Sequence, residues 1–314
     1  MQSQSFANRY LTMRREKIAH GWTLAKRNRG CYLFLAPYAI LFFMFFILPI
    51  GTSICLSFTY YNMLEPPRFI GFQNYINLVL QDEVFLTAIK NTFVAAVIVG
   101  PVGYILSFLF AWFINELPKW LRAVAVIIFY APSIGGAAFQ VFAIIFRGDN
   151  YGWFNSILME LGIISEPYLW LTDPRYMMTI VIIVSLWMSM GTGFLSFVAG
   201  FQGIDRSMYE AGYVDGVRNR WQELYHITLP SMKPMLLFGA VMSITSSFNI
   251  SDVPRTLCGY PSTDYAVRTV VTHLFDYGFS RFEMGYASAI ATILFLIMIL
   301  SKKAIAALLG RVGT

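Results

Sequence analysis

The sequence predicts an all-α, polytopic membrane protein with six transmembrane helices and with both termini in the cytoplasm. Apolar residues make up 57% of the 314 residues, whereas soluble domains contain about 45–50%. Charged residues make up only 13%, which is about half of the usual share. A soluble domain could not bury this much apolar surface, so the composition excludes that class.

The apolar residues are concentrated in six stretches that are suited to bilayer-spanning helices, which need about 20 residues each. The first stretch contains Pro37 near its start and Pro49 in its interior. The stretches cover residues 32–60, 88–114, 121–146, 176–201, 235–250 and 284–300.

The distribution of charge predicts how these helices are oriented. Residues 1–30 form a basic tail in which Glu16 is the only acid, and residues 31–314 form the transmembrane domain. A basic flank before the first span indicates a cytoplasmic N terminus, and six spans return the C terminus to the same side. The net charge of +6 therefore reflects membrane orientation, and no nucleic-acid partner is expected, because no basic patch is interleaved with exposed aromatic residues. The basic residues of the two tails are Arg9, Arg14, Arg15, Lys17, Lys26, Arg27, Arg29, Lys302, Lys303 and Arg311.

Motifs for catalysis and for metal binding are absent from the sequence. There is no H-E-x-x-H, G-x-S-x-G or G-x-x-x-x-G-K-[ST] pattern, so the chain resembles neither a protease nor an ATPase. The three cysteines form no C-x-x-C pair, and the three histidines lie outside the apolar stretches. No Asp, Glu or His lies deep in a predicted span, which argues against a carrier driven by an ion gradient.

Uncharged polar and aromatic side chains do occur within the predicted spans. Such side chains should face protein or water because they are unfavourable in lipid. They indicate either hydrogen bonding between helices or a hydrated path for a neutral, hydroxyl-rich solute. The sequence APSIGG at residues 131–136 should break the third span midway, which suits a cavity lining or a structural kink. The candidate path residues are Tyr130, Gln140, Trp187, Ser246 and Asn249, and Ser133, Ser189 and Ser247 are further polar residues of the same kind.

Two connections on the outer side contain apolar helical faces. In residues 147–175 the pattern predicts a short helix lying on the membrane surface. Residues 252–283 contain a second face of this kind. The two faces consist of Trp153, Phe154, Ile157, Leu158 and Leu161, and of Val267, Val270, Val271, Leu274 and Phe275.

A charged cytoplasmic segment, residues 204–234, separates the fourth and fifth spans. Its first helix should begin at a cap, Asp205, extend to about Val214 and end at Gly216. Ala211 and Gly212 share a face with almost no side chain, which would allow another backbone to approach closely.

A second short helix should follow, with Asn219 as its N-cap. Gln222, at the third helical position, could complete a capping box by bonding back to the backbone of the cap residue. One face would carry Trp221, Leu224, Tyr225 and Thr228, while Glu223 and His226 point away. A helical hairpin resting on lipid headgroups is one interpretation. Balanced acidic and basic residues instead favour a protein socket, since lipid-resting helices prefer basic residues.

The stretch EAGYVDG…ITLP (210–216 and 227–230) resembles the EAA motif of bacterial ABC importer permeases. FLAPYAILFFMFFILPIGTSICLSFTYYN, FIGFQNYINLV, NTFVAAVIVGPVGYILSFLFAWFIN and FEMGYASAIATILFLIMI resemble corresponding stretches of the MalF-like permeases of carbohydrate importers. The resemblance covers nearly the whole chain after about Cys31.

This resemblance implies a multi-pass protein of the bacterial plasma membrane that is not itself an enzyme. It implies pairing with a second permease, usually a different MalG-like chain, over a dimer of cytoplasmic ATPases. ATP and Mg²⁺ would be held by these ATPases, and this chain would bind no cofactor. An extracytoplasmic solute-binding protein would deliver the solute. The motif positions that would contact the ATPase are Glu210, Ala211, Gly212, Asp215, Gly216, Leu229 and Pro230.

The sequence departs from the family motif at two points. Gly212 replaces the second alanine, which weakens the helix by up to ~1 kcal/mol. Ten residues, rather than the usual nine, separate Gly216 from Ile227. One additional residue rotates a helix by about 100°, and we expect the turn at Val217 and Arg218 to absorb it.

The expected function is therefore ATP-driven import of a sugar or oligosaccharide, coupled through residues 204–234. Two alternatives remain at this point. One is an ABC permease for another solute, such as a glycerol phosphodiester, and the other is a carrier driven by an ion gradient.

Overall fold

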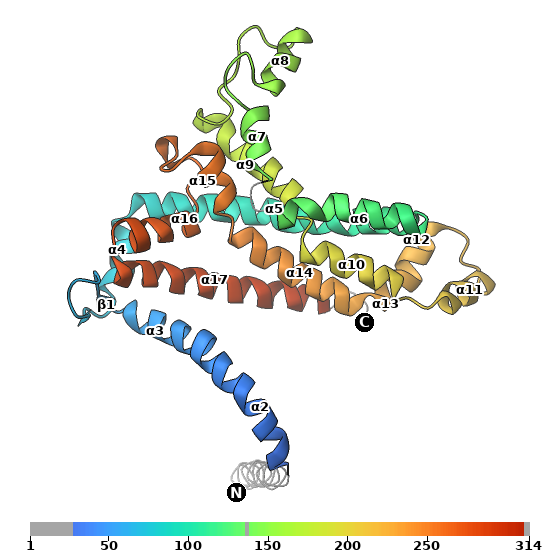
Figure 1. Ribbon diagram of the computed structural model, residues 1–314, viewed down its shortest axis with the longest axis horizontal. Coiled ribbons are helices and arrows are strands. Elements are labelled where there is room, and N and C mark those ends of the chain that lie inside the picture. Colours follow the sequence, from blue (N-terminus) through green and yellow to red (C-terminus); the bar gives the residue numbers. More distant parts are fainter. Residues whose placement is uncertain (1–27, 136–137, 311–314) are drawn as a thin grey trace, which may run out of the picture. The chain divides into compact units, whose positions relative to one another are not determined.

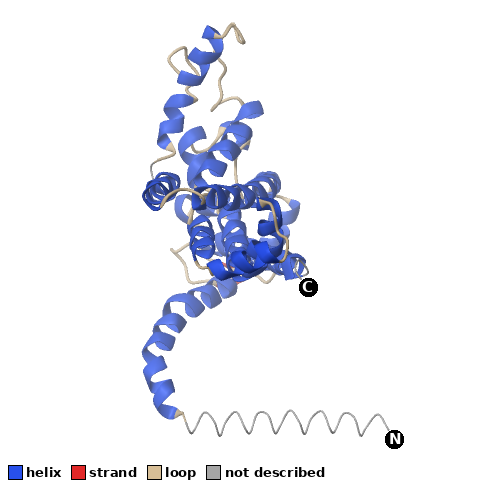
Figure 2. Ribbon diagram, turned by 90° about the vertical axis from the view of Figure 1, so that its right-hand side faces the viewer, coloured by secondary structure: helices blue, strands red, loops and turns tan. Residues whose placement is uncertain are grey.

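The computed structural model describes residues 28–135 and 138–310, and helices joined by loops make up most of the ribbon (Figure 2). The chain divides into two compact units, Met1–Cys55 and Leu56–Thr314. Much of the basic N-terminal tail, Gly136 and Arg311 lie outside the described residues. The only sheet in the described ranges is a two-stranded hairpin.

The first unit contains the first predicted span. Helix α2 (Arg29–Phe42) is followed by a π-helix (Phe43–Ile47) and by α3 (Leu48–Leu56). The helix ends at Leu56 rather than at residue 60, because Thr59–Tyr60 (β1) pair in antiparallel register with Arg68–Phe69 (β2).

Long helices form the body of the second unit (Figure 1). Helix α5 (Glu83–Asn115) packs against α10 (Thr192–Gln202) and α14 (Lys233–Phe248), and α17 (Met284–Gly310) packs against α14. Small residues permit this close packing, as is usual between membrane helices. For example, a Cβ atom at Gly100 of α5 would lie only 3.2 Å from Ser247 Oγ of α14.

Two of the predicted spans are interrupted. The third consists of α6 (Lys119–Ile134) and α7 (Gln140–Ile145), which confirms the predicted break. The fourth consists of α9 (Pro174–Met188) and α10, separated at Gly191, and this second break was not predicted. Within the described residues, five helices are long and apolar enough to span a membrane, and the divided third span is not among them. They are Gly30–Leu56, Glu83–Asn115, Pro174–Gln202, Lys233–Cys258 and Met284–Ala304.

The outer side of the second unit carries shorter helices. The predicted surface helix is α8 (Trp153–Glu160). Its connection is fixed by buried Asn155, whose Oδ1 accepts a hydrogen bond from Trp170 Nε1 over 2.7 Å. The remaining short outer helices are α4 (Gln73–Leu80), α15 (Asp252–Cys258), a 3-10 turn (Thr263–Tyr265), α16 (Val270–Phe275) and a π-helix, η4 (Asp276–Ser280).

A polar network ties the outer ends of α5, α16 and α17 together. Asp82 caps α5 by accepting from the Phe85 N–H over 2.8 Å. Its Oδ2 atom lies 3.0 Å from His273 Nε2 and accepts from the Tyr286 hydroxyl over 3.0 Å. Burial alone would raise the pKa of Asp82, but the His273 and Phe85 hydrogen bonds outweigh it and lower this pKa to about 2.

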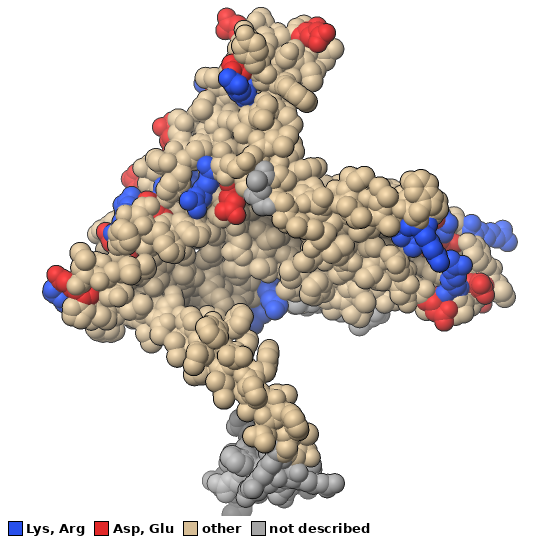
Figure 3. All heavy atoms as spheres, in the orientation of Figure 1, with Lys and Arg blue, Asp and Glu red and all other residues tan. Residues whose placement is uncertain are grey.

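Charged side chains of the second unit gather over its outer connections at one end and over the cytoplasmic segment at the other (Figure 3). The long helices between these ends show few charges on this face. This distribution is typical of a helical bundle whose middle lies in hydrocarbon.

Candidate functional site

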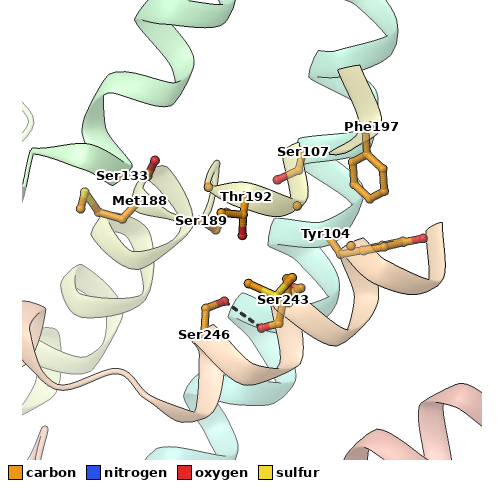
Figure 4. Close-up of a pocket in the computed structure, with 13 residues that line it drawn as sticks. Tyr104, Ser107, Ser133, Met188, Ser189, Thr192, Phe197, Ser243 and Ser246 are labelled. Carbon is orange, nitrogen blue, oxygen red and sulfur yellow. Dashed lines mark hydrogen bonds between the residues drawn. The ribbon is translucent and has the colours of Figure 1, made fainter. Parts of the chain in front are cut away.

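A cavity of about 230 Å³, lined in part by serine hydroxyls, lies where the third and fourth spans are interrupted. Ser133 comes from the end of α6, Met188 ends α9, and Ser189 follows it (Figure 4). Gly191 completes the break as the residue before α10. Irregular backbone within a membrane is tolerated only where it is covered by protein or lines a water-filled space. The two breaks therefore mark this cavity as a candidate solute path. The other lining residues are Tyr104, Ser107, Thr192, Gly193, Phe197, Gly239, Met242, Ser243 and Ser246.

The cavity offers hydroxyl groups and aromatic rings but no charged side chain among its lining residues. Several hydroxyls donate to carbonyls of their own helix: Ser246 Oγ lies 3.0 Å from Ser243 O, and Ser133 Oγ lies 2.7 Å from Tyr130 O. Each of these hydroxyl oxygens retains acceptor capacity. Tyr104 and Phe197 add two aromatic rings to the same lining, with centroids 5.4 Å apart. Such a lining suits a neutral solute that carries hydroxyl groups.

The structure places only part of the predicted solute path at this cavity. Ser246 lines it, as do Ser133 and Ser189. The other four candidate residues do not line it. Tyr130 packs against a hydrophobic cluster, and exposed Gln140 begins α7. The Trp187 ring lies 5.0 Å from that of Phe142, and Asn249 Nδ2 donates to Thr245 O over 2.9 Å.

Sequence reasoning missed Tyr104, Ser107 and Ser243, which line the same cavity from α5 and α14. Ser and Tyr are frequent in membrane helices, so their presence alone does not indicate a cavity. Their position near the glycine-containing break at Gly191 becomes evident only in three dimensions.

The cytoplasmic segment begins with α11 (Arg206–Val214). Asp205 caps this helix, with its Oδ1 accepting from the Ser207 N–H over 3.0 Å. Gly216 ends it with a φ of 95°, a left-handed conformation that favours glycine. The Val217 N–H donates to Gly212 O over 2.9 Å and the Gly216 N–H to Tyr213 O over 3.3 Å. This pattern is a Schellman motif, so the predicted helix boundaries are confirmed.

The second part of the segment contains α12 (Arg220–Glu223), a π-helix, η2 (Leu224–Thr228), and α13 (Leu229–Ser231). Asn219 caps α12 as predicted, accepting from the Gln222 N–H over 2.8 Å. The additional residue was expected to be absorbed at Val217 and Arg218. The structure instead contains η2, whose wider i→i+5 hydrogen-bonded turn accommodates an additional residue within the helix.

Gly212 is not accessible to a partner protein, although the small-residue face was expected to allow close approach of another backbone. It is buried, and a Cβ atom at this position would lie 2.6 Å from Ile227 Cδ1. The gap left by the missing side chain is therefore filled by Ile227 of the same chain. Of the other predicted coupling residues, Leu229 is half-buried and the rest are exposed: Glu210, Ala211, Asp215, Gly216 and Pro230.

The prediction that Glu223 points away from the structure is wrong, because its side chain is only 7% exposed. The Tyr213 hydroxyl donates to Glu223 Oε1 over 2.5 Å, and Arg220 Nη1 donates to Oε2 over 2.9 Å. Burial alone would raise the pKa of Glu223, but these two donors together lower it. The Glu223 hydrogen bond in turn raises the pKa of Tyr213.

The four residues predicted to share one face are divided between two environments. Leu224 and Thr228 are buried, whereas Trp221 is 67% and Tyr225 is 70% exposed. Glu223 replaces them on the buried side because Tyr213 and Arg220 satisfy its carboxylate.

Comparison with known proteins agrees with this architecture. Residues 103–312 match the family described as "Binding-protein-dependent transport system inner membrane component". The chain is 32% identical to the "Probable ABC transporter permease protein YesP" of Bacillus subtilis (strain 168), over 88% of this chain and 89% of the relative. It is 30% identical to the "Arabinooligosaccharides transport system permease protein AraP" of the same organism, over 89% of this chain and 88% of the relative.

A solved structure shares the fold. It belongs to "a bacterial ABC transporter involved in the import of the acidic polysaccharide alginate", with a TM-score of 0.72 and 24% identity over 93% of this chain and 99% of that chain. The family match covers more than half of the sequence, and the relatives cover most of it. The chain therefore belongs to the inner-membrane permease family of binding-protein-dependent ABC transporters, as a multi-pass component that is not itself an enzyme.

Proposed function

We propose that this permease imports a sugar or oligosaccharide, using ATP that is hydrolysed by a separate ATPase dimer. The observation that carries the proposal is the cavity between the helix breaks, which is lined by hydroxyls and rings and by no charged residue. Sugars need hydrogen-bonding partners and a ring to stack on but no countercharge. The arabinooligosaccharide permease among the relatives supports the same solute class.

The proposed transporter contains three kinds of partner besides this chain: a second permease, a solute-binding protein and an ATPase dimer. A second, MalG-like permease would complete the path, and an extracytoplasmic binding protein would deliver the solute. The ATPase dimer would hold ATP and Mg²⁺ and would receive the exposed motif residues Glu210, Ala211, Asp215 and Gly216.

The contacts of the cytoplasmic segment suggest how ATPase motion reaches the cavity. Arg220 Nη2 contacts Glu116 Oε2 at the cytoplasmic end of α5, and the ring centroids of Trp221 and Trp112 lie 5.2 Å apart. Helix α5 carries Tyr104 and Ser107 at the cavity. Helix α13 leads almost directly into α14, which carries Ser243 and Ser246. Movement of the segment would therefore be transmitted to two walls of the cavity.

Transport assays on the reconstituted complex can test the solute class. We expect ATP-dependent uptake of a radiolabelled neutral oligosaccharide into proteoliposomes, with no uptake of a glycerol phosphodiester. Uptake of the phosphodiester alone would favour the alternative ABC substrate. Uptake driven by an ion gradient without ATP would contradict the proposal.

One variant and two controls test the role of the cavity. Ser246→Val replaces a hydroxyl of the cavity wall with an apolar group, and we expect KM for the oligosaccharide to rise by ~10-fold. Asn249→Ala and Gln140→Ala alter residues outside the cavity and should leave KM unchanged. An unchanged KM in Ser246→Val together with a raised KM in the other two variants would indicate that the solute path runs along the end of α14 and the start of α7.

A further inference from the structure

A second cavity, of about 600 Å³, lies on the cytoplasmic side between the ends of the spans and the cytoplasmic segment. Its walls come from the end of α5, the start of α6, the end of α10 and the segment from α11 to η2. The volume falls within the range of small-molecule sites, about 300–1,000 Å³. Its charged lining residues are Glu116, Lys119, Arg122, Arg206, Arg220 and Glu223.

The charges around this cavity do not balance. Both carboxylates, Glu116 and Glu223, are bound by Arg220 over 2.8 and 2.9 Å. In the part of the chain that the structure describes, no carboxylate lies within ion-pair distance of the other three cationic residues. Lys119, Arg122 and Arg206 therefore leave an excess of positive charge around one cavity.

Arg122 is held in place by the chain that ends α5. Its Nη2 atom donates to Asn115 O over 2.7 Å and to Leu117 O over 3.2 Å, which are carbonyls at and just after the C-terminal end of this helix. These two bonds fix the guanidinium beside the cavity that Arg122 lines.

We propose that this cavity binds the phosphate group of a phosphate ester. Arginine and lysine side chains are the groups that proteins use to bind phosphate, and a fixed guanidinium suits its oxygens. A bound phosphate would link Lys119, the first residue of α6, to Arg206, the first residue of α11. It would thereby join the cytoplasmic segment to the spans. The phosphate belongs either to an anionic lipid headgroup or to a soluble ester, and the inference does not depend on the transported solute.

Binding to the full-length chain in phosphatidylcholine nanodiscs tests the proposal. One arm measures the retention of added phosphatidylglycerol by native mass spectrometry, and the other measures binding of radiolabelled glycerol 3-phosphate by equilibrium dialysis. The test variant is Lys119→Gln/Arg206→Gln, in which both altered side chains are exposed and neither pairs with an acid of the described residues. The control is Arg218→Gln, an exposed residue of the same segment that does not line the cavity.

We expect one of the two probes to bind the double variant at least ~10-fold more weakly than the wild-type chain, because two charge-assisted contacts are lost. The control should match the wild type. Weakened lipid retention would identify a headgroup site, and weakened dialysis binding would identify a soluble ester site. Equal binding of both probes to the wild type and the double variant would overturn the proposal, and so would an equal loss in the Arg218 control.

Discussion

Arg220 donates to Glu116 over 2.8 Å, although 104 residues of sequence separate them. The same guanidinium also binds Glu223 of α12. One side chain thus connects the cytoplasmic segment to the end of α5, the helix that forms a wall of the cavity between the helix breaks. This connection provides a direct test of how the segment is coupled to the spans.

Breaking the Arg220–Glu116 pair should reduce coupling more than stability. Both side chains are exposed, 60% for Arg220 and 44% for Glu116, and exposed pairs contribute about 0–1 kcal/mol. We expect the free energy of unfolding of Glu116→Gln to differ from that of the wild type by no more than this amount. Solute-stimulated ATP hydrolysis in the assembled complex should nevertheless be severalfold lower. Glu65→Gln breaks an exposed pair with Arg68 elsewhere in the second unit and should leave hydrolysis unchanged. Equal rates in all three proteins would refute the mechanical link.

Gly216 should tolerate no bulky β-branched residue, because its φ of 95° is strained for such side chains. We expect Gly216→Val to insert into the membrane but to abolish solute-stimulated ATP hydrolysis, since the strain of about 1–3 kcal/mol would displace the end of α11. The matched control is Gly162→Val at an outer turn, where φ is 69°. The control should keep its stimulation, and unchanged stimulation in Gly216→Val would count against a coupling role.

The packing of Gly212 against Ile227 predicts a compensating pair of substitutions. Alanine at position 212 would favour the helix by up to ~1 kcal/mol. Its Cβ would meet Ile227 Cδ1 at 2.6 Å, and overpacking of this kind is unfavourable by about 1–3 kcal/mol. Gly212→Ala should therefore lower the thermal unfolding temperature, and adding Ile227→Val, which removes Cδ1, should restore it. If the double variant is no more stable than Gly212→Ala, the contact is not the cause.

Asp82 should make stability depend on pH in acid. Its pKa is lowered to about 2 in the folded protein, from 3.8. A lowered carboxyl pKa stabilises the folded state above the unfolded-state pKa, and this contribution is lost as pH falls from about 4 toward 2. We expect Asp82→Asn to be less stable than the wild type near pH 6 and the difference to shrink below pH 4. Thermal unfolding of both proteins across this range measures it, and a constant difference would show that Asp82 acts without titrating.

The sequence alone determined the features that depend on local chemistry. Apolar stretches of sufficient length predict the spans, since hydrocarbon requires helices whose backbone groups bond internally. Asp205, Asn219 and Gly216 predict the helix ends of the cytoplasmic segment, because capping depends on residues only a few positions apart. The APSIGG sequence predicted the break in the third span, and the quoted motifs indicated the family.

The tertiary structure decided which residues meet. Asn249 and Gln140 have suitable chemistry for a sugar, but the break at Gly191 forms the cavity beside Ser246, Ser243 and Tyr104 instead. Glu223 is buried because Tyr213 and Arg220 surround its carboxylate, and Gly212 is closed because Ile227 fills the space beside it. These contacts depend on how the helices pack and on where η2 widens a turn. They cannot be predicted from the composition and periodicity of one segment, because the contacting side chains belong to another segment.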